Sequence, residues 1–368
     1  SGGHALMLYI MHVVGARPNF MKVAPVAAAL SSRANVRQTL VHTGQHYDSN
    51  MSEVFFRQLG IPEPDLNLEV GSGSHARQTA HIMLRFEEVV LDQKPDMVLV
   101  YGDVNSTVGA ALVCAKLLVP VGHVEAGLRS FDRTMPEEIN RLLTDQIADL
   151  LFTPSVDGDE NLLREGVARE KVHLVGNVMI DTLVKLLPEA MALWDDLRST
   201  YNYEKYGLVT LHRPSNVDNL DMLGRIMATL NEISEDLPFV FPLHPRTSNK
   251  IIENNTLSRS SDFHLIEPLD YLAFLALQRH ATLVITDSGG IQEETTFLGV
   301  PCLTLRENTE RPITIEMGTN TLVGQDLERL KEEVYRILAG AGKRGSVPPL
   351  WDGNAAERIA QVVVNHLV

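Results

Sequence analysis

A serine, two glycines and a carboxylate follow one apolar run of the chain in an order that suits phosphate binding. The sequence Thr-Asp-Ser-Gly-Gly-Ile-Gln-Glu-Glu comes directly after the run 281–285, which predicts a short buried strand that turns at once into a helix. Such a turn gathers free backbone N–H groups and the positive end of the helix dipole. We therefore expect Ser288, Gly289 and Gly290 to bind a phosphate and Glu294 to accept hydrogen bonds from sugar hydroxyls. The alternative is a tight turn without a ligand.

A second anion site is predicted where the first apolar run ends in Gly-Ala-Arg-Pro-Asn. Arg17 lies in a loop that leads into a helix, and Lys22 follows about one turn later. A guanidinium and an ammonium together suit an anion. A surface arginine beside an ordinary helix start is the alternative. The segment lacks the G-x-G-x-x-G pattern, so NAD is not predicted as a cofactor.

Three carboxylates follow neighbouring apolar runs and are candidates for proton transfer. Asp103 follows the run 97–101, Glu125 closes the run 121–125, and Glu137 stands at a predicted helix start. Asp103 also suits a helix N-cap, and Glu137 suits the positive end of a helix dipole. A charge that closes an apolar strand, as Glu125 does, is unusual unless it is used. Together with the nearby cations, the three predict acid–base catalysis.

Two histidine–arginine pairs follow strands in the second half of the chain. His212 and Arg213 follow one strand, and His244 and Arg246 follow the next. A lone core histidine is usually structural, but two such pairs beside a phosphate turn favour binding or catalysis. Phe274, on the helix before the Ser-Gly-Gly strand, could stack on a base, although such a residue more often packs in the core.

His42 and His46 are close enough in sequence to suggest a metal site. They would face the same way only on a helix, and Gly44 between them favours a loop. The sequence also lacks an HExxH pattern and a cysteine cluster. We therefore expect no metal and interpret Gln45 and His46 as part of a polar binding loop.

The elements that must position these residues alternate along the whole chain. Short apolar runs alternate with helical patterns, which predicts the α/β class with parallel sheets covered by helices on both faces. The expected strands are 7–14, 39–42, 97–101, 121–125, 151–153 and 172–175, then 207–211, 239–243, 263–266, 283–286 and 301–305. The expected helices are 20–30, 77–91, 107–118, 137–150, 220–233, 271–279, 327–338 and 355–367.

A polar and aromatic stretch at 188–205 separates the two sets of strands. We therefore predict two Rossmann-like, doubly wound domains that face each other across a cleft, at 5–187 and 205–350. The last segment, 351–368, is expected to pack back on the N-terminal domain. Ligands bind beyond the carboxyl ends of strands in such sheets, so we place the site in the cleft.

The composition sets limits on the function. The chain has 368 residues, of which 44% are hydrophobic and 21% charged, as in a globular protein with room for two domains. A net charge of −15 argues against a general nucleic-acid binder, although a local basic pocket can still hold a nucleotide.

Several features bear on location. Residues 1–4 are typical of a cloning remnant, and the apolar run after them lacks the basic flank of a signal peptide, so we interpret it as a strand. No apolar run is long enough to predict a transmembrane helix. Cys114 and Cys302 lie in apolar segments and are expected to be buried, reduced thiols, which favours the cytoplasm.

Taken together, these residues resemble the non-hydrolysing UDP-N-acetylglucosamine 2-epimerases of bacteria. The matching segments are 15–25, 45–46, 102–103, 123–129, 136–141, 212–213, 287–294 and 310–312. The resemblance implies a glycosyltransferase-B fold without a metal or NAD. It implies interconversion of UDP-GlcNAc and UDP-ManNAc by elimination of UDP to 2-acetamidoglucal and re-addition. The family usually serves surface polysaccharide synthesis, and we expect a homodimer.

The resemblance implies roles for the candidate residues. Asp103, Glu125 and Glu137 would be the acid and base carboxylates, in an order that stays open. His212 is a further candidate catalytic residue, and it would also hold the diphosphate together with Arg17, Lys22, Arg311 and the Ser288–Gly290 turn. Glu294 would bind the ribose and the Phe274 region the uracil. The other substrate-binding candidates are Arg141, Arg213 and His244. Some members bind a second UDP-GlcNAc as an activator, through residues such as Gln45 and His46.

The chain departs from the pattern of the resemblance at 19–20, 214–216 and 245–247. These positions leave the exact hexosamine open, because relatives that act on UDP-2,3-diacetamido-glucuronic acid share the same frame. Three further hypotheses stay open: a UDP-sugar glycosyltransferase, a hydrolysing epimerase and a non-catalytic sensor of sugar nucleotides.

Overall fold

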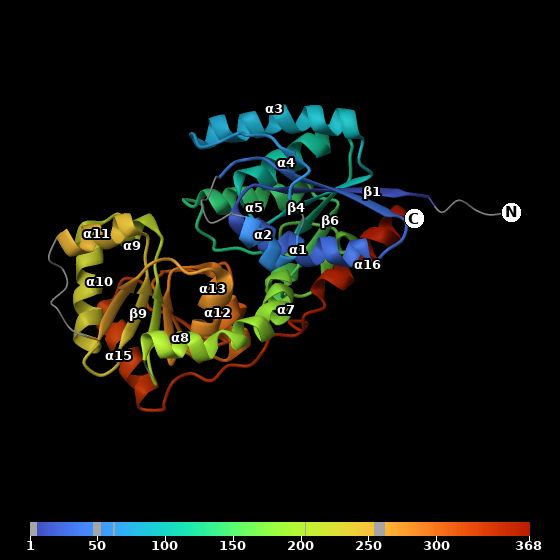
Figure 1. The fold of residues 1–368 in the computed structure, drawn as a ribbon. Coiled ribbons are helices and arrows are strands. Elements are labelled where there is room, and N and C mark those ends of the chain that lie inside the picture. Colours follow the sequence, from blue (N-terminus) through green and yellow to red (C-terminus); the bar gives the residue numbers. More distant parts are fainter. Residues whose placement is uncertain (1–5, 47–52, 62, 203, 254–261) are drawn as a thin grey trace. The chain divides into compact units, whose positions relative to one another are not determined.

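The structure is a computed structural model that describes residues 6–46, 53–61, 63–202, 204–253 and 262–368. The predicted cloning remnant lies outside these residues. The chain divides into two compact units (Figure 1). The first unit contains Ser1–Lys185 and Pro349–Val368, and the second contains Leu186–Pro348.

The first unit contains a seven-stranded sheet in which all strands are parallel. Its order is β3-β2-β1-β4-β5-β6-β7. The strands are β1 (Leu8–Val14), β2 (Val36–His42), β3 (Leu66–Asn67), β4 (Met97–Tyr101), β5 (Val121–Val124), β6 (Leu150–Thr153) and β7 (Val172–Leu174). Every residue of β1 and β4 is buried, because helices cover both faces of the sheet.

The helices of the first unit form a layer on each face of its sheet. Figure 1 shows α3 and α4 on one side of β1 and α1 and α16 on the other. The helices are α1 (Arg17–Ser31), α2 (Glu53–Leu59), α3 (His75–Gln93), α4 (Asn105–Lys116), α5 (Pro136–Ile147), α6 (Val156–Arg164) and α16 (Ala355–Leu367), with a 3₁₀ turn at Arg169–Lys171. This arrangement is a doubly wound α/β fold.

The second unit repeats the pattern with six parallel strands in the order β10-β9-β8-β11-β12-β13. The strands are β8 (Gly207–Thr210), β9 (Phe239–Pro242), β10 (Phe263–Ile266), β11 (Leu283–Thr286), β12 (Cys302–Thr304) and β13 (Asn320–Leu322). Leu208 and Val209 are neighbours in β8 but belong to different hydrophobic clusters. Successive side chains of a strand point to opposite faces, so this sheet too has a core on each face.

The helices of the second unit supply those two cores. Leu230 of α10 and Leu330 of α15 belong to one cluster, and Leu277 of α12 and Ile291 of α13 belong to the other. The helices are α8 (Trp194–Tyr201), α9 (Pro214–Val217), α10 (Leu220–Ile233), α11 (Pro245–Glu253), α12 (Tyr271–His280), α13 (Gly289–Leu298), α14 (Ile313–Glu316) and α15 (Leu327–Leu338).

The fold class predicted from the sequence is confirmed, with some elements missed. The edge strands β3 and β13 were not predicted, because their sequences, Leu-Asn and Asn-Thr-Leu, are short and partly polar. The stretch predicted as a break between the domains is largely helical. Helix α7 (Val178–Ala192) crosses the boundary between the units, and α8 follows it.

Helix α16 is fixed to the first unit by a carboxylate. Asp181 accepts hydrogen bonds from the N–H groups of Ala355 (3.1 Å) and Ala356 (2.8 Å), at the start of α16. Trp351 donates its indole N–H to Pro154 O at 2.9 Å. The chain therefore returns to the first unit for its last helix.

Both sheets reverse their strand order at one point. The reversal lies between β1 and β4 in the first sheet and between β8 and β11 in the second. Ligands of doubly wound folds bind beyond the carboxyl ends of the strands at this switch point. The loops after these four strands are therefore the first places to look for a site.

Among the described helices, none combines the length and apolar character needed to cross a membrane.

Candidate active site

The first unit brings a buried ion pair to its switch point. Lys22 of α1 lies 2.9 Å from Glu125, which follows β5, and both side chains are less than a tenth exposed. Gly102, after β4, has a φ of +71°, and a Cβ there would lie only 3.2 Å from Lys22 Nζ and 3.9 Å from Glu125 Oε1. Residues from three elements therefore converge at this point.

Glu125 itself has an uncommon backbone conformation. Its φ is 74°, in the left-handed region that is unfavourable for residues other than glycine by about 1–2 kcal/mol. Such conformations gather at functional sites, where the surrounding structure holds them in place. The sequence singled out Glu125 as a charge that closes an apolar strand, and its left-handed backbone conformation is a second unusual feature of this residue.

Asp103, on the neighbouring strand end, is held by α5. Arg141 donates to its carboxylate at 2.6 Å, and Asn140 donates to its backbone carbonyl at 2.9 Å. Arg141 also contacts Glu138 at 3.1 Å. Asp103 keeps 24% of its side chain exposed, so one face of a paired carboxylate is accessible.

Two adjacent glutamates at the start of α5 have different environments in the structure. Glu137 is exposed, whereas Glu138 is buried and accepts the backbone N–H groups of Ser130 and Phe131. Glu138 was interpreted from the sequence only as an acid that suits the helix start, whereas in the structure it pairs with Arg141. The predicted catalytic role of Glu137 remains a prediction, since the structure places it only on the same helix start that holds Asp103.

A buried network that the sequence analysis missed supports the loop after β4. His123 Nδ1 lies 2.6 Å from Asp145, and its Nε2 lies 2.7 Å from the carbonyl oxygen of Gly102. Burial alone would raise the pKa of Asp145, but His123 and Arg129 hold that pKa below its ordinary value. The ring of His123 therefore fixes the residue that precedes Asp103.

The other predicted groups of the first unit differ in exposure. Arg17 is half-buried, and its guanidinium lies 5.1 Å from the ring centroid of Phe55, a cation–π contact. Gln45 is buried and accepts from the backbone N–H (2.9 Å) and hydroxyl (2.6 Å) of Ser106 at the start of α4. His46 beside it is exposed. Of the proposed binding loop, His46 is thus the more accessible side chain.

In the second unit, Asp287 holds the loop after β8. It is fully buried at the end of β11, and it accepts the backbone N–H groups of His212 and Arg213. His212 Nδ1 lies 2.9 Å from the same carboxylate, while 64% of its side chain is exposed. The histidine ring is thereby held at one edge and open at the other.

The strand, turn and helix expected around Ser288–Gly290 are present, and phosphate binding at this turn stays a prediction. Ser288 precedes α13 in extended conformation, and no side chain caps the start of this helix among the described residues. A Cβ at Gly289 would lie too close to the guanidinium of Arg311 and to the carboxylate of Glu310, so these side chains would have to shift for any other residue. Arg311 is buried between Glu293 and Glu310, with which it forms ion pairs. The start of α13 therefore leaves its backbone N–H groups without a side-chain cap, which suits an anion, while the Arg311 beside it is already paired with two carboxylates.

Glu294, in the first turns of α13, accepts a hydrogen bond from the Tyr271 hydroxyl at 2.5 Å. Burial raises the pKa of Glu294 from its ordinary 4.5 to about 7. Phe274 is half-buried and packs against the cluster around Tyr206, the more usual role for such a residue. His244 is exposed, and its Nδ1 accepts the backbone N–H of Arg246 at 3.2 Å.

The raised pKa of Glu294 predicts a pH-dependent contribution to stability. The carboxyl of Glu294 binds its proton more tightly in the folded protein than in the unfolded one. Its contribution to the free energy of unfolding is therefore complete below about pH 4.5 and is lost as the pH rises through about 7. The loss amounts to about 3 kcal/mol. Glu294→Gln stays neutral, so we expect its free energy of unfolding in urea to fall less than that of the wild type between about pH 5 and 8. Equal slopes would contradict this prediction.

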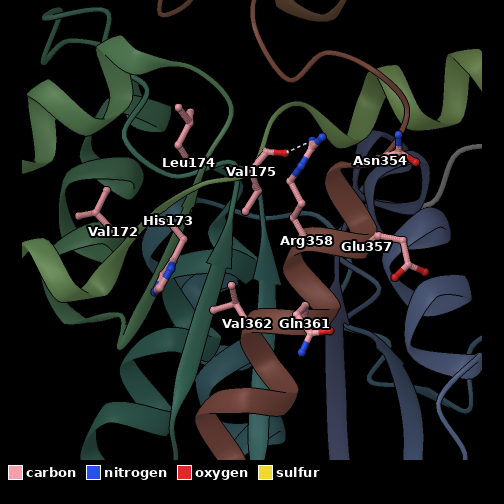
Figure 2. A pocket seen from close by; sticks show the side chains of 9 residues that line it. All are labelled: Val172, His173, Leu174, Val175, Asn354, Glu357, Arg358, Gln361 and Val362. Carbon is pink, nitrogen blue, oxygen red and sulfur yellow. Dashed lines mark hydrogen bonds between the residues drawn. The ribbon is translucent and has the colours of Figure 1, made fainter.

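A hollow of about 680 Å³ lies elsewhere in the first unit, between β7 and α16 (Figure 2). Arg358 crosses it and donates to the carbonyl oxygen of Val175 at 2.9 Å. Strand β7 is three positions from β4 at the edge of the sheet, and none of the predicted site residues lines the hollow.

In the described part of the chain, no group of three or more His, Cys, Asp or Glu side chains is arranged to hold a metal.

Comparison with known proteins places this geometry in a family. The sequence model of the family described as UDP-N-acetylglucosamine 2-epimerase matches residues 28–364. The UDP-N-acetylglucosamine 2-epimerase of Methanococcus maripaludis is 43% identical over 95% of this chain and 97% of that protein. This chain belongs to the UDP-N-acetylglucosamine 2-epimerase family.

Other members agree in fold and differ in name. The crystal structure of the Methanocaldococcus jannaschii UDP-GlcNAc 2-epimerase, in complex with UDP-GlcNAc and UDP, matches 97% of this chain and all of that chain, with a TM-score of 0.88 and 43% identity. The UDP-2,3-diacetamido-2,3-dideoxy-D-glucuronate 2-epimerase of Pseudomonas aeruginosa is 42% identical over 96% of this chain and 98% of that protein. The glycosyltransferase-B fold expected from the resemblance is confirmed, and this family of epimerases uses it for more than one sugar nucleotide.

Proposed function

We propose that this epimerase interconverts UDP-GlcNAc and UDP-ManNAc by eliminating UDP to give 2-acetamidoglucal and adding UDP back. The observation that carries the proposal is the pair of carboxylates at the adjacent ends of β4 and β5, each held by a buried cation. Asp103 is bound by Arg141, and Glu125 is bound by Lys22. The names of the relatives, at 43% identity, support the substrate.

The chemistry explains why such a set is needed. The hydrogen on C2 is a weak acid, and it becomes removable only as the C1–O bond to UDP breaks. The electron pair of that bond leaves with the diphosphate, the C2 proton passes to a carboxylate, and the electrons of the C2–H bond form the C1=C2 double bond of the glycal. The enzyme must therefore stabilise a departing anion and present a base at the neighbouring carbon. Asp103, Glu125 and Glu137 are the proposed acid and base groups.

The remaining groups of the proposal bind the nucleotide. Arg17, Lys22, His212 and Arg311, with the Ser288–Gly290 turn, would hold the diphosphate. Arg141, Arg213 and His244 complete the substrate-binding set. Glu294 would accept the ribose hydroxyls, and the Phe274 region would face the uracil. The uncapped start of α13 beside Arg311 supports the diphosphate assignment.

Product analysis tests the reaction. Incubation with UDP-GlcNAc is expected to give UDP-ManNAc and no net release of free sugar. Free ManNAc with UDP would identify a hydrolysing epimerase, sugar transfer to an acceptor would identify a glycosyltransferase, and binding without turnover would identify a sensor.

A second substrate is supported by one specific observation. The diacetamido-glucuronate epimerase of Pseudomonas aeruginosa is 42% identical to this chain, almost the same as the first relative. Turnover of the two UDP-sugars in parallel decides between them, and a higher kcat/KM for the diacetamido-glucuronate compound would replace UDP-GlcNAc in our proposal.

We also propose that a second UDP-GlcNAc activates the enzyme near His46. Turnover of UDP-ManNAc alone should then be slow and should rise when a trace of UDP-GlcNAc is added. His46→Ala is expected to weaken this activation, and it is a better probe than a change at Gln45 because Gln45 holds the start of α4. A hyperbolic rate curve with no activation of the reverse reaction would contradict the activator.

We further propose an assembly, a pathway and a location for the enzyme. A homodimer and a role in surface polysaccharide synthesis follow from the family resemblance. Cys114 and Cys302 are both free and buried, which supports a cytoplasmic location. Light scattering of the purified protein tests the dimer.

A further inference from the structure

Asp287, at the second switch point, accepts several hydrogen bonds. The proposed reaction assigns it no role. Its side chain is fully buried. Four groups point at it: the backbone N–H groups of His212 (3.1 Å) and Arg213 (2.9 Å), the side-chain amide of Asn216 (3.0 Å) and Nδ1 of His212 (2.9 Å). A carboxylate has about four acceptor positions, so these donors satisfy it.

We propose that Asp287 is a positioning residue for the epimerisation: it fixes His212 with the proton on Nδ1 and with Nε2 directed away from the carboxylate, toward the departing diphosphate. The inference deepens the proposed function and rests on it. Asp287 would act through His212 and would not itself touch the substrate.

The protonation of the ring follows from that of the carboxylate. Burial alone would raise the pKa of Asp287, but the bonds from His212, Asn216 and the backbone hold that pKa below its ordinary value, so the group is ionised at neutral pH. An ionised carboxylate only accepts hydrogen bonds, and the Nδ1 facing it must therefore donate. The bond that one ring nitrogen makes fixes the state of the other. In the neutral ring, Nε2 is left as the acceptor.

The place of Asp287 in the fold links the ring to the phosphate turn. Strands β8 and β11 pair side by side, with Thr210 opposite Thr286. Asp287 follows Thr286 and directly precedes the Ser288–Gly290 turn, so one carboxylate both anchors the loop of His212 and begins the proposed phosphate site. No described residue bonds Nε2 of His212, and 64% of that side chain is exposed.

This arrangement suits the leaving-group side of the elimination. When the C1–O bond breaks, the diphosphate oxygen gains the electron pair and needs a donor. His212 must therefore take a second proton from solvent on Nε2 before the C1–O bond breaks. The charged ring then donates a hydrogen bond from Nε2 to the diphosphate while its Nδ1–H stays bonded to Asp287, which stabilises the charge. When UDP adds back, the same contacts operate in reverse, and no proton is gained or lost overall.

The first test needs no substrate. We would label histidine with ¹⁵N and determine the tautomer of His212 at a pH where the ring is neutral, assigning its signals by their absence in His212→Asn. The wild type is expected to carry the proton on Nδ1. Asp287→Asn presents an amide that can donate to Nδ1, so the proton should move to Nε2. Asn216→Ala removes a different donor to Asp287 and should leave the tautomer unchanged.

Two outcomes of this test would overturn the proposal: a wild-type ring protonated on Nε2, or an Asp287→Asn ring that keeps its proton on Nδ1. The wild-type measurement decides even if the Asp287→Asn variant does not fold. It is also independent of the reaction, so an enzyme that fails to epimerise UDP-GlcNAc would remove the proposed function without removing the tautomer result.

The second test is a double-mutant cycle on turnover. Asp287→Asn is expected to lower kcat about 100-fold, the scale of a general acid–base contribution, with a smaller change in the Kd of UDP. In the His212→Asn background, Asp287→Asn should have little further effect, because residues that act as one unit are not additive. Fully multiplicative losses would show that Asp287 does not act through His212 and would overturn the proposal.

Discussion

Replacing Asp103 by Asn is expected to abolish proton exchange at C2 while UDP still binds. The change keeps the size of the side chain but removes an ionisable group that Arg141 holds at 2.6 Å. Loss of a general acid or base lowers rates by about 10²–10⁴-fold. The groups that we propose to bind the diphosphate belong to other residues. The Kd of UDP, measured by calorimetry, should therefore change little.

Glu165→Gln is a matched control for Asp103→Asn. Glu165 pairs with buried Arg129 at 2.8 Å and has the same side-chain exposure as Asp103, 24%. Both substitutions therefore break a similar ion pair, but only one removes a proposed catalytic group. Exchange should survive in Glu165→Gln. Retained exchange in Asp103→Asn would exclude Asp103 from its role.

Glu125→Gln is expected to lose exchange to a similar degree and also to lose stability. Its partner Lys22 would remain charged and buried, and removing one partner of a buried ion pair costs about 3–5 kcal/mol. Glutamine keeps the backbone and length of the side chain, so the left-handed φ stays the same in both proteins. Urea unfolding measures the stability, and the C2 exchange assay measures the activity.

The double variant Lys22→Met with Glu125→Gln separates the two effects. It removes both charges, so much of the stability should return while exchange stays lost. Recovery of exchange in the double variant would show that Glu125 is not an acid–base group. A Glu125→Gln protein as stable as the wild type would contradict a buried pair at this site.

The strands and the residues at their ends were predictable because of burial. Strands covered on both faces are continuous apolar runs, so a charge such as Glu125 that closes one stands out in the sequence. The same reasoning found Asp103 and the Ser288–Gly290 turn. It could not find β3 (Leu-Asn) or β13 (Asn-Thr-Leu), because neither is an apolar run.

The sequence alone did not reveal which side chains, distant from each other along the chain, form pairs in the fold. Glu138 and Asp145 are ordinary helix residues in the sequence, yet each is buried and holds a loop near Asp103. Asp287 was visible as part of a motif, but its hold on His212 depends on β8 and β11 being neighbours. Such contacts follow from strand order, which alternation alone does not reveal.

Incubation with UDP-GlcNAc in D₂O tests the central claim most directly. If UDP leaves and a carboxylate moves a proton on the neighbouring carbon, deuterium will enter C2 of the UDP-ManNAc that forms, and mass spectrometry will show a gain of one mass unit there. The Asp103→Asn and Glu125→Gln proteins should show no incorporation. Epimerised product that keeps its original hydrogen at C2 in the wild-type enzyme would contradict the account.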